Sequence, residues 1–407
     1  FGISSLVGGL ATSAGTLVAA RLVQGVGAAM MTPAALSILT TTFREGRDRN
    51  KALGAWGAMA GLSSAAGVLF GGLLADGPGW RWVLLVNVPV CVVVIVGSFR
   101  LFSGERRTAQ LSTFDSLGAV LGTGGMLLLV YAIVEAPNVG WGATRTIAGL
   151  AGAAVVLAAF AINELRSPNP LFPFSIFRIK GVAAADATQL IALAGFYSTF
   201  FFVTLYMQNV LGYSPIEAGV AYLPATVAVA AAAALSSQLF ARTGTRPVIV
   251  AGALLGAAGI FHVSRIPVDG SYVSDLLPGL LVMSVGLGAV FVGVITAANA
   301  GVPPDKAGLA ASLISASQQL GAALGLAIFT AIATSRTSDL LGSASPPDQL
   351  AALTSGYRYA LTASAAFVLG AAVIATRAGE MPPRSNDRNG SAVSIPSRNQ
   401  RSAEDVA

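Results

Sequence analysis

Charge is what this sequence has least of. Lysine, arginine, aspartate and glutamate make up 10% of its 407 residues, whereas about 25% of the residues of a soluble domain are charged. Apolar residues make up 54% of the chain, and the mean hydropathy is +0.73. This composition excludes an ordinary soluble domain and predicts a protein whose helices cross a lipid bilayer several times.

Cysteine and histidine are scarcer still. Cys91 is the single cysteine and lies in an apolar segment, and His262 is the single histidine. One cysteine builds neither a disulfide framework nor a cysteine metal site within one chain. We therefore expect no cofactor and no zinc, iron or thiol chemistry.

Nucleotide and nucleic-acid binding are not expected either. Two glycine-rich runs, Gly122 to Gly125 and Gly286 to Gly288, lie within apolar segments of bilayer length. A phosphate-binding loop follows a strand, so neither run is interpreted as a nucleotide site, and no enzyme activity is expected. The net charge of +6 would favour nucleic acid in a soluble protein, but here the positions of the charges point to a membrane.

Twelve apolar segments follow one another along the chain. About 20 residues are needed to cross the hydrocarbon core, and the first segment is too short and opens on Phe1, so we expect an N-terminal truncation inside a helix. We predict an all-α, polytopic membrane protein with eleven complete transmembrane helices and a partial first one. The segments are 1–11, 15–43, 51–75, 82–102, 114–135, 145–165, 181–209, 215–240, 246–266, 274–300, 306–334 and 356–377.

Basic residues are concentrated in alternate connections between these segments. By the positive-inside rule the richer side faces the cytoplasm, which places the C-terminus there and the chain in the plasma membrane. The tail, 378–407, has almost nothing to bury and is predicted to be disordered. Eighteen of the 24 basic residues lie on the richer side: Arg44, Arg47, Arg49, Lys51, Arg100, Arg106, Arg107, Arg166, Arg178, Lys180, Arg242, Arg246, Lys306, Arg377, Arg384, Arg388, Arg398 and Arg401.

The stretch from Leu17 to Phe43 is mostly apolar but carries Arg21 and Gln24. An arginine within a membrane helix costs about 2.5–3.5 kcal/mol on insertion scales, so it is expected to face protein or a water-filled cavity. Alternatively, Arg21 lies only about 7 Å along the helix and extends outward to the lipid headgroups. At about 100° per residue, one small or polar stripe of this helix is formed by Arg21, Gln24, Gly25, Ala28, Thr32 and Ala35.

A second polar stripe follows segment 181–209. Such a stripe on a membrane helix indicates a cavity wall, and Asp186 could exchange a proton there. The alternative is that Asp186, near the start of the helix, lies among the cytoplasmic headgroups. Within an arc of roughly 100° lie Asp186, Gln189, Tyr197, Thr204 and Gln208, and Gln319 of segment 306–334 is a further candidate for the same cavity.

Segment 51–75 carries small residues on one face, at Gly57, Gly61, Ser64, Gly71 and Gly72. Small residues let helix backbones approach closely, in either a moving interface or a static crossing. A repeat between Leu22–Gly27 and Leu281–Gly286 indicates two parallel halves, as in major facilitator transporters.

Several motifs, in the same order along the chain, resemble the fourteen-helix drug:proton antiporter family of the major facilitator superfamily. Arg21-x-x-Gln24-Gly25-x-Gly27 is similar to the family's fourth-helix motif. The run of Gly54, Gly57, Gly61, Gly67, Gly71 and Gly72 is similar to its fifth-helix antiporter motif. Further resemblance is carried by Trp80-Arg81-Trp82, Asn87-Val88-Pro89, Gln208 with Gly212-Tyr213-Ser214-Pro215, and Gln319-Leu320-Gly321.

The chain departs from this family at identifiable positions. Gly67-Val68 stands where the antiporter motif has Gly-Pro, Ser63 stands where it has glycine, and Ala241 stands where a loop motif commonly has aspartate. Proline kinks a membrane helix, so we expect segment 51–75 to be straighter than in relatives and antiport to be weaker. The motif between the second and third helices, and any coupling carboxylate on the first helix, are not in this chain.

The resemblance implies a major facilitator fold and a secondary transporter that exports drugs, antibiotics or other amphipathic compounds in exchange for protons. The implied organisation is the remainder of an N-terminal bundle in 1–102, two inserted helices with linkers in 103–180, a six-helix bundle in 181–377 and the tail. Expected partners are a small-molecule substrate, protons and the lipid bilayer. The alternatives are a non-functional transporter fragment and a polytopic membrane enzyme or sensor, which would carry a catalytic cluster or a soluble domain.

Overall fold

The computed structural model describes residues 1–43, 52, 63, 66–67, 69–101, 115–171, 174–179, 181–299, 302, 307–342 and 348–378. All regular secondary structure in these ranges is helical, which confirms the all-α prediction. The helices are α1 (Gly2–Gly9), α2 (Ala14–Thr42), α4 (Arg81–Leu85), α5 (Asn87–Leu101), α6 (Ser116–Val139), α7 (Thr144–Arg166), η2 (Phe174–Arg178), α8 (Val182–Asn209), α9 (Pro215–Ala221), α10 (Leu223–Thr243), α11 (Thr245–Val263), η3 (Tyr272–Leu276), α12 (Leu277–Asn299), α13 (Ala307–Leu341) and α14 (Gln349–Ala375).

Ten helical stretches in the described part of the chain are long and apolar enough to cross a membrane. They correspond to ten of the twelve expected segments. The expected first segment contains the 8-residue helix α1, and most of segment 51–75, including Gly54, Gly57, Gly61 and Val68, lies outside the described residues. The expectation about the straightness of that helix therefore concerns residues that the structure does not describe.

The largest boundary differences occur where α13 and α14 meet. Helix α13 extends to Leu341 and α14 begins at Gln349, beyond the expected limits of 334 and 356. Hydropathy alone misses these turns because they carry polar residues. Thr337 Oγ1 donates hydrogen bonds to the carbonyl oxygens of Ala333 at 2.9 Å and Ala352 at 3.4 Å, which joins the end of α13 to the start of α14.

Short-range signals determine where several helices begin. The Ser13 hydroxyl caps α2 by accepting a hydrogen bond from the Thr16 N–H at 3.2 Å. At α9, Ser214 and Glu217 form a reciprocal capping box around Pro215. Gly244, with φ +81°, makes the sharp turn between α10 and α11, because glycine adopts positive φ without steric cost.

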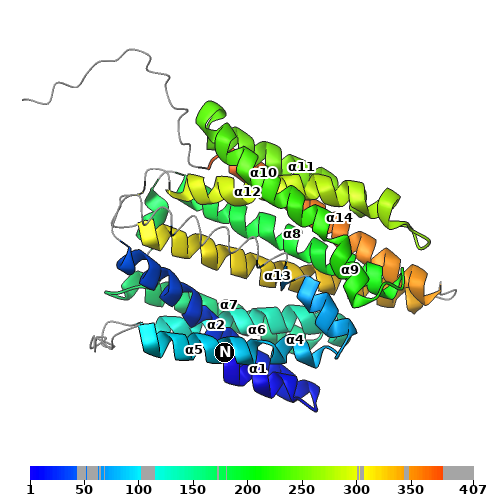
Figure 1. Ribbon diagram of the computed structural model, residues 1–407, viewed down its shortest axis with the longest axis horizontal. Coiled ribbons are helices and arrows are strands. Elements are labelled where there is room, and N and C mark those ends of the chain that lie inside the picture. The colour runs from blue at the N-terminus through cyan, green and yellow to red at the C-terminus, as the bar shows by residue number, and fades with distance from the viewer. Residues whose placement is uncertain are drawn as a thin grey trace, which may run out of the picture.

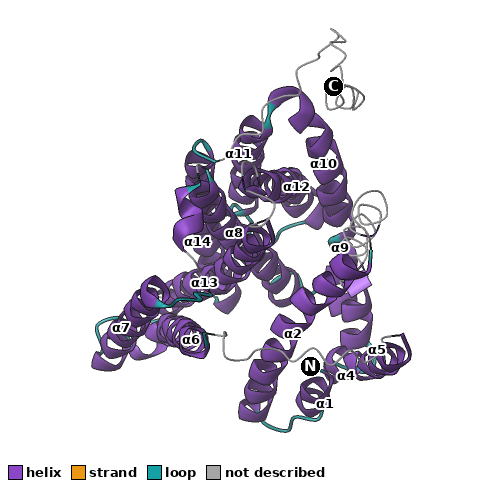
Figure 2. Cartoon of the chain, turned by 90° about the vertical axis from the view of Figure 1, so that its left-hand side faces the viewer, coloured by secondary structure: helices purple, strands orange, loops and turns teal. Residues whose placement is uncertain are grey.

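The helices form three packed groups (Figures 1 and 2). Helices α8 to α14 pack into one bundle, α6 packs along α7, and α1 contacts α2, α4 and α5. The α6–α7 pair is joined to the large bundle through α13, and Trp141 Nε1 donates to Ser335 Oγ at 3.4 Å between them. Helix α13 is therefore the member of the large bundle that contacts the α6–α7 pair.

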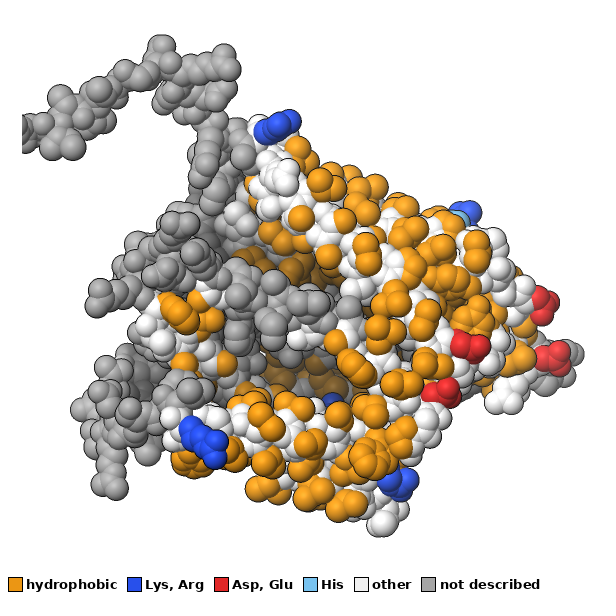
Figure 3. All heavy atoms as spheres, viewed as in Figure 1, with side chains coloured by type: hydrophobic (Ala, Val, Ile, Leu, Met, Phe, Trp, Pro, Cys, Tyr) orange, Lys and Arg blue, Asp and Glu red, His pale blue; other side chains and the backbone are white. Residues whose placement is uncertain are grey.

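The interior of the α8–α14 bundle holds the large buried side chains, which include Tyr206, Phe196, Phe202 and Phe329. Helices α11 and α12 cross at backbone contact: a β-carbon on Gly286 would clash with the backbone of Gly252 and Gly256. The outward sides of the helices are apolar (Figure 3), as expected for a surface that faces lipid.

The turns joining α8 to α9, α11 to α12 and α13 to α14 lie at one end of the large bundle, which we call the acidic end. Its carboxylates are Glu217, Asp269, Asp275, Asp339 and Asp348, and acidic side chains are visible at the right of Figure 3. Many of the basic residues that define the opposite end, Arg44 and Lys180 among them, lie outside the described residues, so the orientation in the membrane stays a prediction.

Candidate functional site

Arg21 and Gln24 on α2 belong to a short chain of polar contacts with α1. The Arg21 guanidinium donates to Gln24 Oε1 at 2.5 Å, and Gln24 Nε2 donates to Ser5 Oγ at 2.5 Å. Gln24 is 3% exposed and Ser5 is fully buried, whereas the Arg21 side chain is exposed. Gln24 therefore joins α2 to α1, and the arginine beside it is exposed.

The remainder of the α2 stripe is less enclosed. Gly25 is exposed, and a β-carbon added to it would meet nothing within 4 Å. Thr32 lies in α2, but its side chain is outside the described residues. The described part of the structure thus leaves space beside Gly25 on α2.

Asp186 on α8 is buried against α13. Its side chain is 5% exposed, and Ser317 Oγ donates to its Oδ1 at 3.2 Å. The other carboxylate oxygen, Oδ2, is buried without a hydrogen-bond partner in the described part of the chain. A buried polar atom in this condition is costly.

Gln189 lies one turn further along α8 and is completely buried. Neither its Oε1 nor its Nε2 has a hydrogen-bond partner among the described residues. Two neighbouring side chains on one helix thus bring three unsatisfied polar atoms into the bundle, and native interiors contain few such atoms.

Glycines on α13 allow this close packing. A β-carbon on Gly321 would lie 2.2 Å from the carbonyl oxygen of Leu190, and one on Gly325 would lie 2.4 Å from that of Ala194. The α8 and α13 backbones therefore touch just beyond the Asp186–Ser317 contact. Gly321 belongs to the Gln319-Leu320-Gly321 motif, and its structural role is this close approach.

Tyr197 and Gln318 continue the contact between α8 and α13 toward the middle of the helices. Gln318 Nε2 donates to Tyr197 Oη at 3.1 Å, and the Tyr197 side chain is 44% exposed. Gln319, the residue expected from the sequence, is exposed and makes no such contact. Tyr197 and Gln318 therefore present a pair of bonded polar groups on this face.

The last part of the α8 stripe contacts Tyr222, the residue between α9 and α10. Thr204 Oγ1 lies 2.9 Å from Tyr222 Oη, and the carbonyl of Phe200 accepts a hydrogen bond from that tyrosine at 2.8 Å. Gln208 is partly exposed near the acidic end. The structure therefore divides the predicted stripe into three parts. Asp186 and Gln189 are buried, Tyr197 and Gln208 are at least partly exposed, and Thr204 contacts Tyr222.

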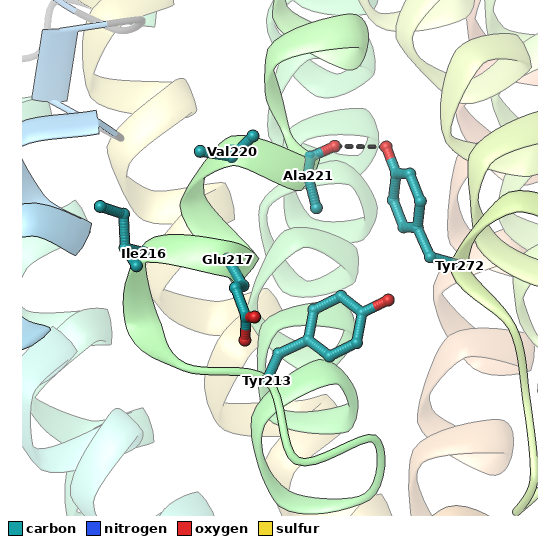
Figure 4. A pocket seen from close by; sticks show the side chains of 6 residues that line it. All are labelled: Tyr213, Ile216, Glu217, Val220, Ala221 and Tyr272. Atoms are coloured by element: carbon teal, nitrogen blue, oxygen red, sulfur yellow. Dashed lines mark hydrogen bonds between the residues drawn. The ribbon is translucent and has the colours of Figure 1, made fainter.

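A pocket of about 610 Å³ opens at the acidic end (Figure 4). The side chains of Tyr213 and Glu217 lie next to each other, and Tyr272 stands opposite with its hydroxyl donating to the Ala221 carbonyl at 2.5 Å. Ile216 and Val220 complete the lining. Aromatic rings beside one carboxylate suit a weakly cationic, amphipathic compound.

The end of the antiporter-motif segment reaches this region. A β-carbon on Gly72 would lie 2.9 Å from the Pro215 carbonyl oxygen and 3.0 Å from Cα of Ile216, whereas Gly67 and Gly71 face open space. Gly72 therefore brings segment 51–75 against the start of α9, so that the two halves of the chain meet at the acidic end.

Family comparison assigns this architecture. Residues 1–326 match the Major Facilitator Superfamily. The chain belongs to the major facilitator superfamily. The resemblance drawn from the motifs is thus confirmed, and a major facilitator protein is a multi-pass membrane transporter rather than an enzyme.

Relatives within the superfamily are resistance and export proteins. The puromycin resistance protein pur8 of Streptomyces alboniger is 36% identical over 403 residues, covering 98% of this chain and 80% of the relative. The cephamycin export protein CmcT of Amycolatopsis lactamdurans is 37% identical over 377 residues, covering 92% and 76%. The chain is therefore similar over most of its length to one antibiotic resistance protein and one antibiotic export protein.

A solved major facilitator structure has the same fold. It is a bacterial homolog of the human lysosomal transporter Spinster in an inward-facing and occupied conformation. The TM-score is 0.58 with 18% sequence identity, and the match covers 92% of this chain and 79% of that chain. At this identity the match shows the fold alone.

Three polar partners were not predicted from the sequence: Ser5, Ser317 and Gln318. Each has a small hydroxyl or an amide side chain. Each contacts a residue of a different helix, at least 19 residues away in the sequence. A helical projection identifies the polar face of one helix, but it does not say which residue of another helix meets it. In the described part of the chain, no three His, Cys, Asp or Glu side chains gather as metal ligands would.

Proposed function

We propose that this protein exports amphipathic organic compounds across the plasma membrane in exchange for protons, by alternating access of two helical halves. The observation that carries the proposal is the similarity to antibiotic export and resistance proteins over 92–98% of the chain. Puromycin and cephamycin, named in those relatives, are organic compounds with both apolar and polar parts. Major facilitator transporters bind such substrates near the membrane midplane, between their halves.

Polar groups on both halves support a substrate site of low charge. Arg21 and Gln24 contribute from α2, and Tyr197 and Gln318 contribute from the α8–α13 contact. These groups are few, and their neighbours are small or apolar, so apolar or weakly cationic compounds are the expected cargo. The pocket of Tyr213, Glu217 and Tyr272 is a second contact on the route toward the acidic end.

Asp186 is the proposed proton-exchanging group. An ionised carboxylate in an apolar interior is strongly disfavoured unless it is paired, and Asp186 has one hydroxyl donor, Ser317, among the described residues. A proton on the carboxylate removes this cost while α8 and α13 are in contact. Movement of α13 away from Asp186 would admit water and allow the proton to leave.

Transport in inverted membrane vesicles tests both parts of the proposal. An imposed pH gradient is expected to drive uptake of puromycin or ethidium by the wild-type protein. Asp186→Asn is expected to lose at least about tenfold of this proton-driven uptake, a smaller effect than the roughly 10²- to 10⁴-fold contribution of a positioned acid–base group in catalysis, while substrate exchange without a gradient is retained. The matched control is Asp339→Asn, which changes an exposed carboxylate on α13 and should transport normally.

The possible outcomes separate the two parts. Unchanged proton-driven uptake in Asp186→Asn would remove Asp186 from the proton path and leave the export function standing. Absence of uptake and of exchange for both probes in wild-type vesicles would contradict the export function for these compounds.

We also propose that the acidic end faces outward and that the C-terminus is cytoplasmic. The asymmetry of basic residues along the sequence supports this orientation. A topology reporter fused after Arg107 or Lys180 should read cytoplasmic, and one fused after Asn138 should read external. A reversed result at either loop would contradict the orientation.

A further inference from the structure

Three arginines from three helices converge in one pocket at the acidic end of the large bundle. Arg265 follows α11, Arg336 lies in the last turns of α13, and Arg358 lies near the start of α14. The pocket has a volume of about 380 Å³, and its remaining lining is Phe261, Ser264, Ser355, Tyr359 and Thr362. Basic residues are scarce on this side of the sequence, so three of them in one pocket require a reason.

Neighbouring side chains orient two of the guanidinium groups. Arg265 lies over the ring of Phe261 at 4.7 Å, and Arg336 lies over the ring of Tyr359 at 4.6 Å. Arg336 Nε also donates to Ser355 Oγ at 3.4 Å. Stacking on an aromatic face reduces the freedom of arginine and leaves its outer N–H groups available to a further ligand.

Carboxylates do not neutralise the cluster. Although the acidic end carries five of them, none lines this pocket, and none of the three arginines forms an ion pair within the described ranges of the chain. Three like charges in one pocket repel one another. An anion with several acceptor oxygens would relieve that repulsion, and the guanidinium fork matches a phosphate in particular.

Two exposed apolar stripes lead away from the pocket along the membrane-facing sides of α11 and α14, which pack against each other. Their spacing of three and four residues keeps each stripe on one face of its helix. From Phe261 the first stripe continues through Ala258, Leu255, Leu254 and Ala251, and from Thr362 the second continues through Ala366, Leu369 and Val373.

We infer that this pocket binds the phosphate of an anionic phospholipid, whose acyl chains lie along the α11 and α14 stripes. A phosphate held by the arginines would place the headgroup at the level of the helix ends and the hydrocarbon over the apolar stripes. A soluble phosphate would use the same arginines, whereas a phospholipid would use both the arginines and the apolar stripes beside them. The guanidinium fork matches the phosphate of a lipid headgroup as well as a free phosphate. The inference does not depend on the proposed export function.

The inference is tested by native mass spectrometry, which measures lipid binding to the purified protein after its own lipids have been removed. Phosphatidylglycerol is added in one series and phosphatidylcholine in another, and inorganic phosphate serves as the soluble competitor. We expect phosphatidylglycerol to bind at least about tenfold more tightly than phosphatidylcholine, and Arg265→Gln/Arg358→Gln to lose this preference, because the variant removes two of the three charged donors for the anionic headgroup. The variant Arg265→Lys/Arg358→Lys, which keeps the charge but loses the fork, should fall between the two.

Arg145→Gln provides the matched control. Arg145 is an exposed arginine on α7 that stacks on Tyr131 and donates to its hydroxyl, but it lies in another helix pair, so this variant should keep the preference. Thermal unfolding of the delipidated variants checks that they are folded, and an unfolded double variant is replaced by Arg358→Gln alone. Equal binding of both lipids by the wild-type protein, an unchanged preference in the glutamine variant, or an equal loss in Arg145→Gln would overturn the inference. Displacement of phosphatidylglycerol by millimolar phosphate would assign the pocket to a soluble anion and overturn the lipid assignment.

Discussion

At the scale of single residues, Gln24 is the side chain that connects α2 to α1 in the N-terminal half. It accepts from Arg21 and donates to the fully buried Ser5 hydroxyl. Replacing it by leucine would leave the Ser5 hydroxyl buried without its partner, which costs about 1–3 kcal/mol, although hydrogen bonds between membrane helices average only about 0.6 kcal/mol. We expect Gln24→Leu to lower the temperature of thermal unfolding in detergent.

Gln319→Leu is the control for that substitution, because it makes the same chemical change at an exposed glutamine on α13. It should unfold within about a degree of the wild-type protein, since surface substitutions usually change stability by less than about 0.5 kcal/mol. Equal destabilisation by the two variants would mean that the Gln24–Ser5 contact contributes nothing specific.

The sequence alone identified one member of most polar pairs and missed the other. Asp186, Gln24 and Tyr197 were found because a polar residue in an apolar helix is conspicuous. Their partners Ser317, Ser5 and Gln318 were not, because serine is common within membrane helices and the register between two helices depends on packing. The neighbours Gln318 and Gln319 show this clearly, since only the helix rotation determines which of them meets Tyr197.

At the scale of helices, Gly321 controls how closely α13 approaches α8. A β-carbon there would lie 2.2 Å from the carbonyl oxygen of Leu190, so Gly321→Ala must push the helices apart near the Asp186–Ser317 contact. Overpacking of this kind costs about 1–3 kcal/mol. We expect the variant to unfold at a lower temperature and to transport more slowly in the vesicle assay.

Gly370→Ala on α14 is the matched control for the α13 substitution. Nothing lies within 4 Å of a β-carbon at that position, and alanine is favoured over glycine in a helix by up to about 1 kcal/mol. This variant should be as stable as the wild-type protein or slightly more so. Equal loss of stability in both variants would show that glycine flexibility, rather than close packing, matters.

The start of α6 provides a test based on pH. The Gly118 N–H donates to the Asp115 carboxylate at 2.7 Å and holds the pKa of Asp115 below its usual value, and donation by Asn163 Nδ2 at 2.7 Å adds to this effect. A depressed pKa in the folded protein means that the ionised carboxylate stabilises the fold above the unfolded-state pKa of 3.8. This contribution is lost as the pH falls through the lower, folded-state pKa.

Asp115→Asn isolates that contribution, because asparagine still caps a helix but does not titrate. The wild-type protein should unfold at a higher temperature than the variant at pH 6, and the difference should shrink as the pH is lowered below about 4. Thermal unfolding of both proteins across this range measures the difference. A gap that stays constant from pH 6 to pH 3 would contradict the role of the Asp115 charge.

At the scale of the whole molecule, hydropathy predicted the fold well because a bilayer imposes one strong requirement on every segment. Backbone groups must be satisfied within a helix, and the helix must be long enough to cross. The prediction failed at the end of α13 and the start of α14, where polar residues such as Arg336 and Ser355 continue the helices beyond the apolar run. Those extensions also contribute Arg336 and Ser355 to the arginine pocket, which composition could not reveal.

The contact between Gly72 and the start of α9 makes alternating access testable at the level of the entire transporter. Since the two halves touch there, with a Gly72 β-carbon position 3.0 Å from Cα of Ile216, cysteines at both positions should form a disulfide under mild oxidation. If the acidic end must open for release, that bond holds it closed. In a Cys91→Ser background, oxidised Gly72→Cys/Ile216→Cys should lose most of its puromycin export, and a reductant should restore it.

The two single-cysteine variants are the controls, because they carry the same substitutions but cannot form the bond within one molecule. They should export equally well before and after oxidation. Full export by a protein that is demonstrably cross-linked would mean that the halves do not separate at the acidic end, and the release route would have to lie elsewhere. Loss of export without recovery on reduction would instead trace the defect to the substitutions, since Gly72 packs directly against the Pro215 backbone and tolerates little added volume.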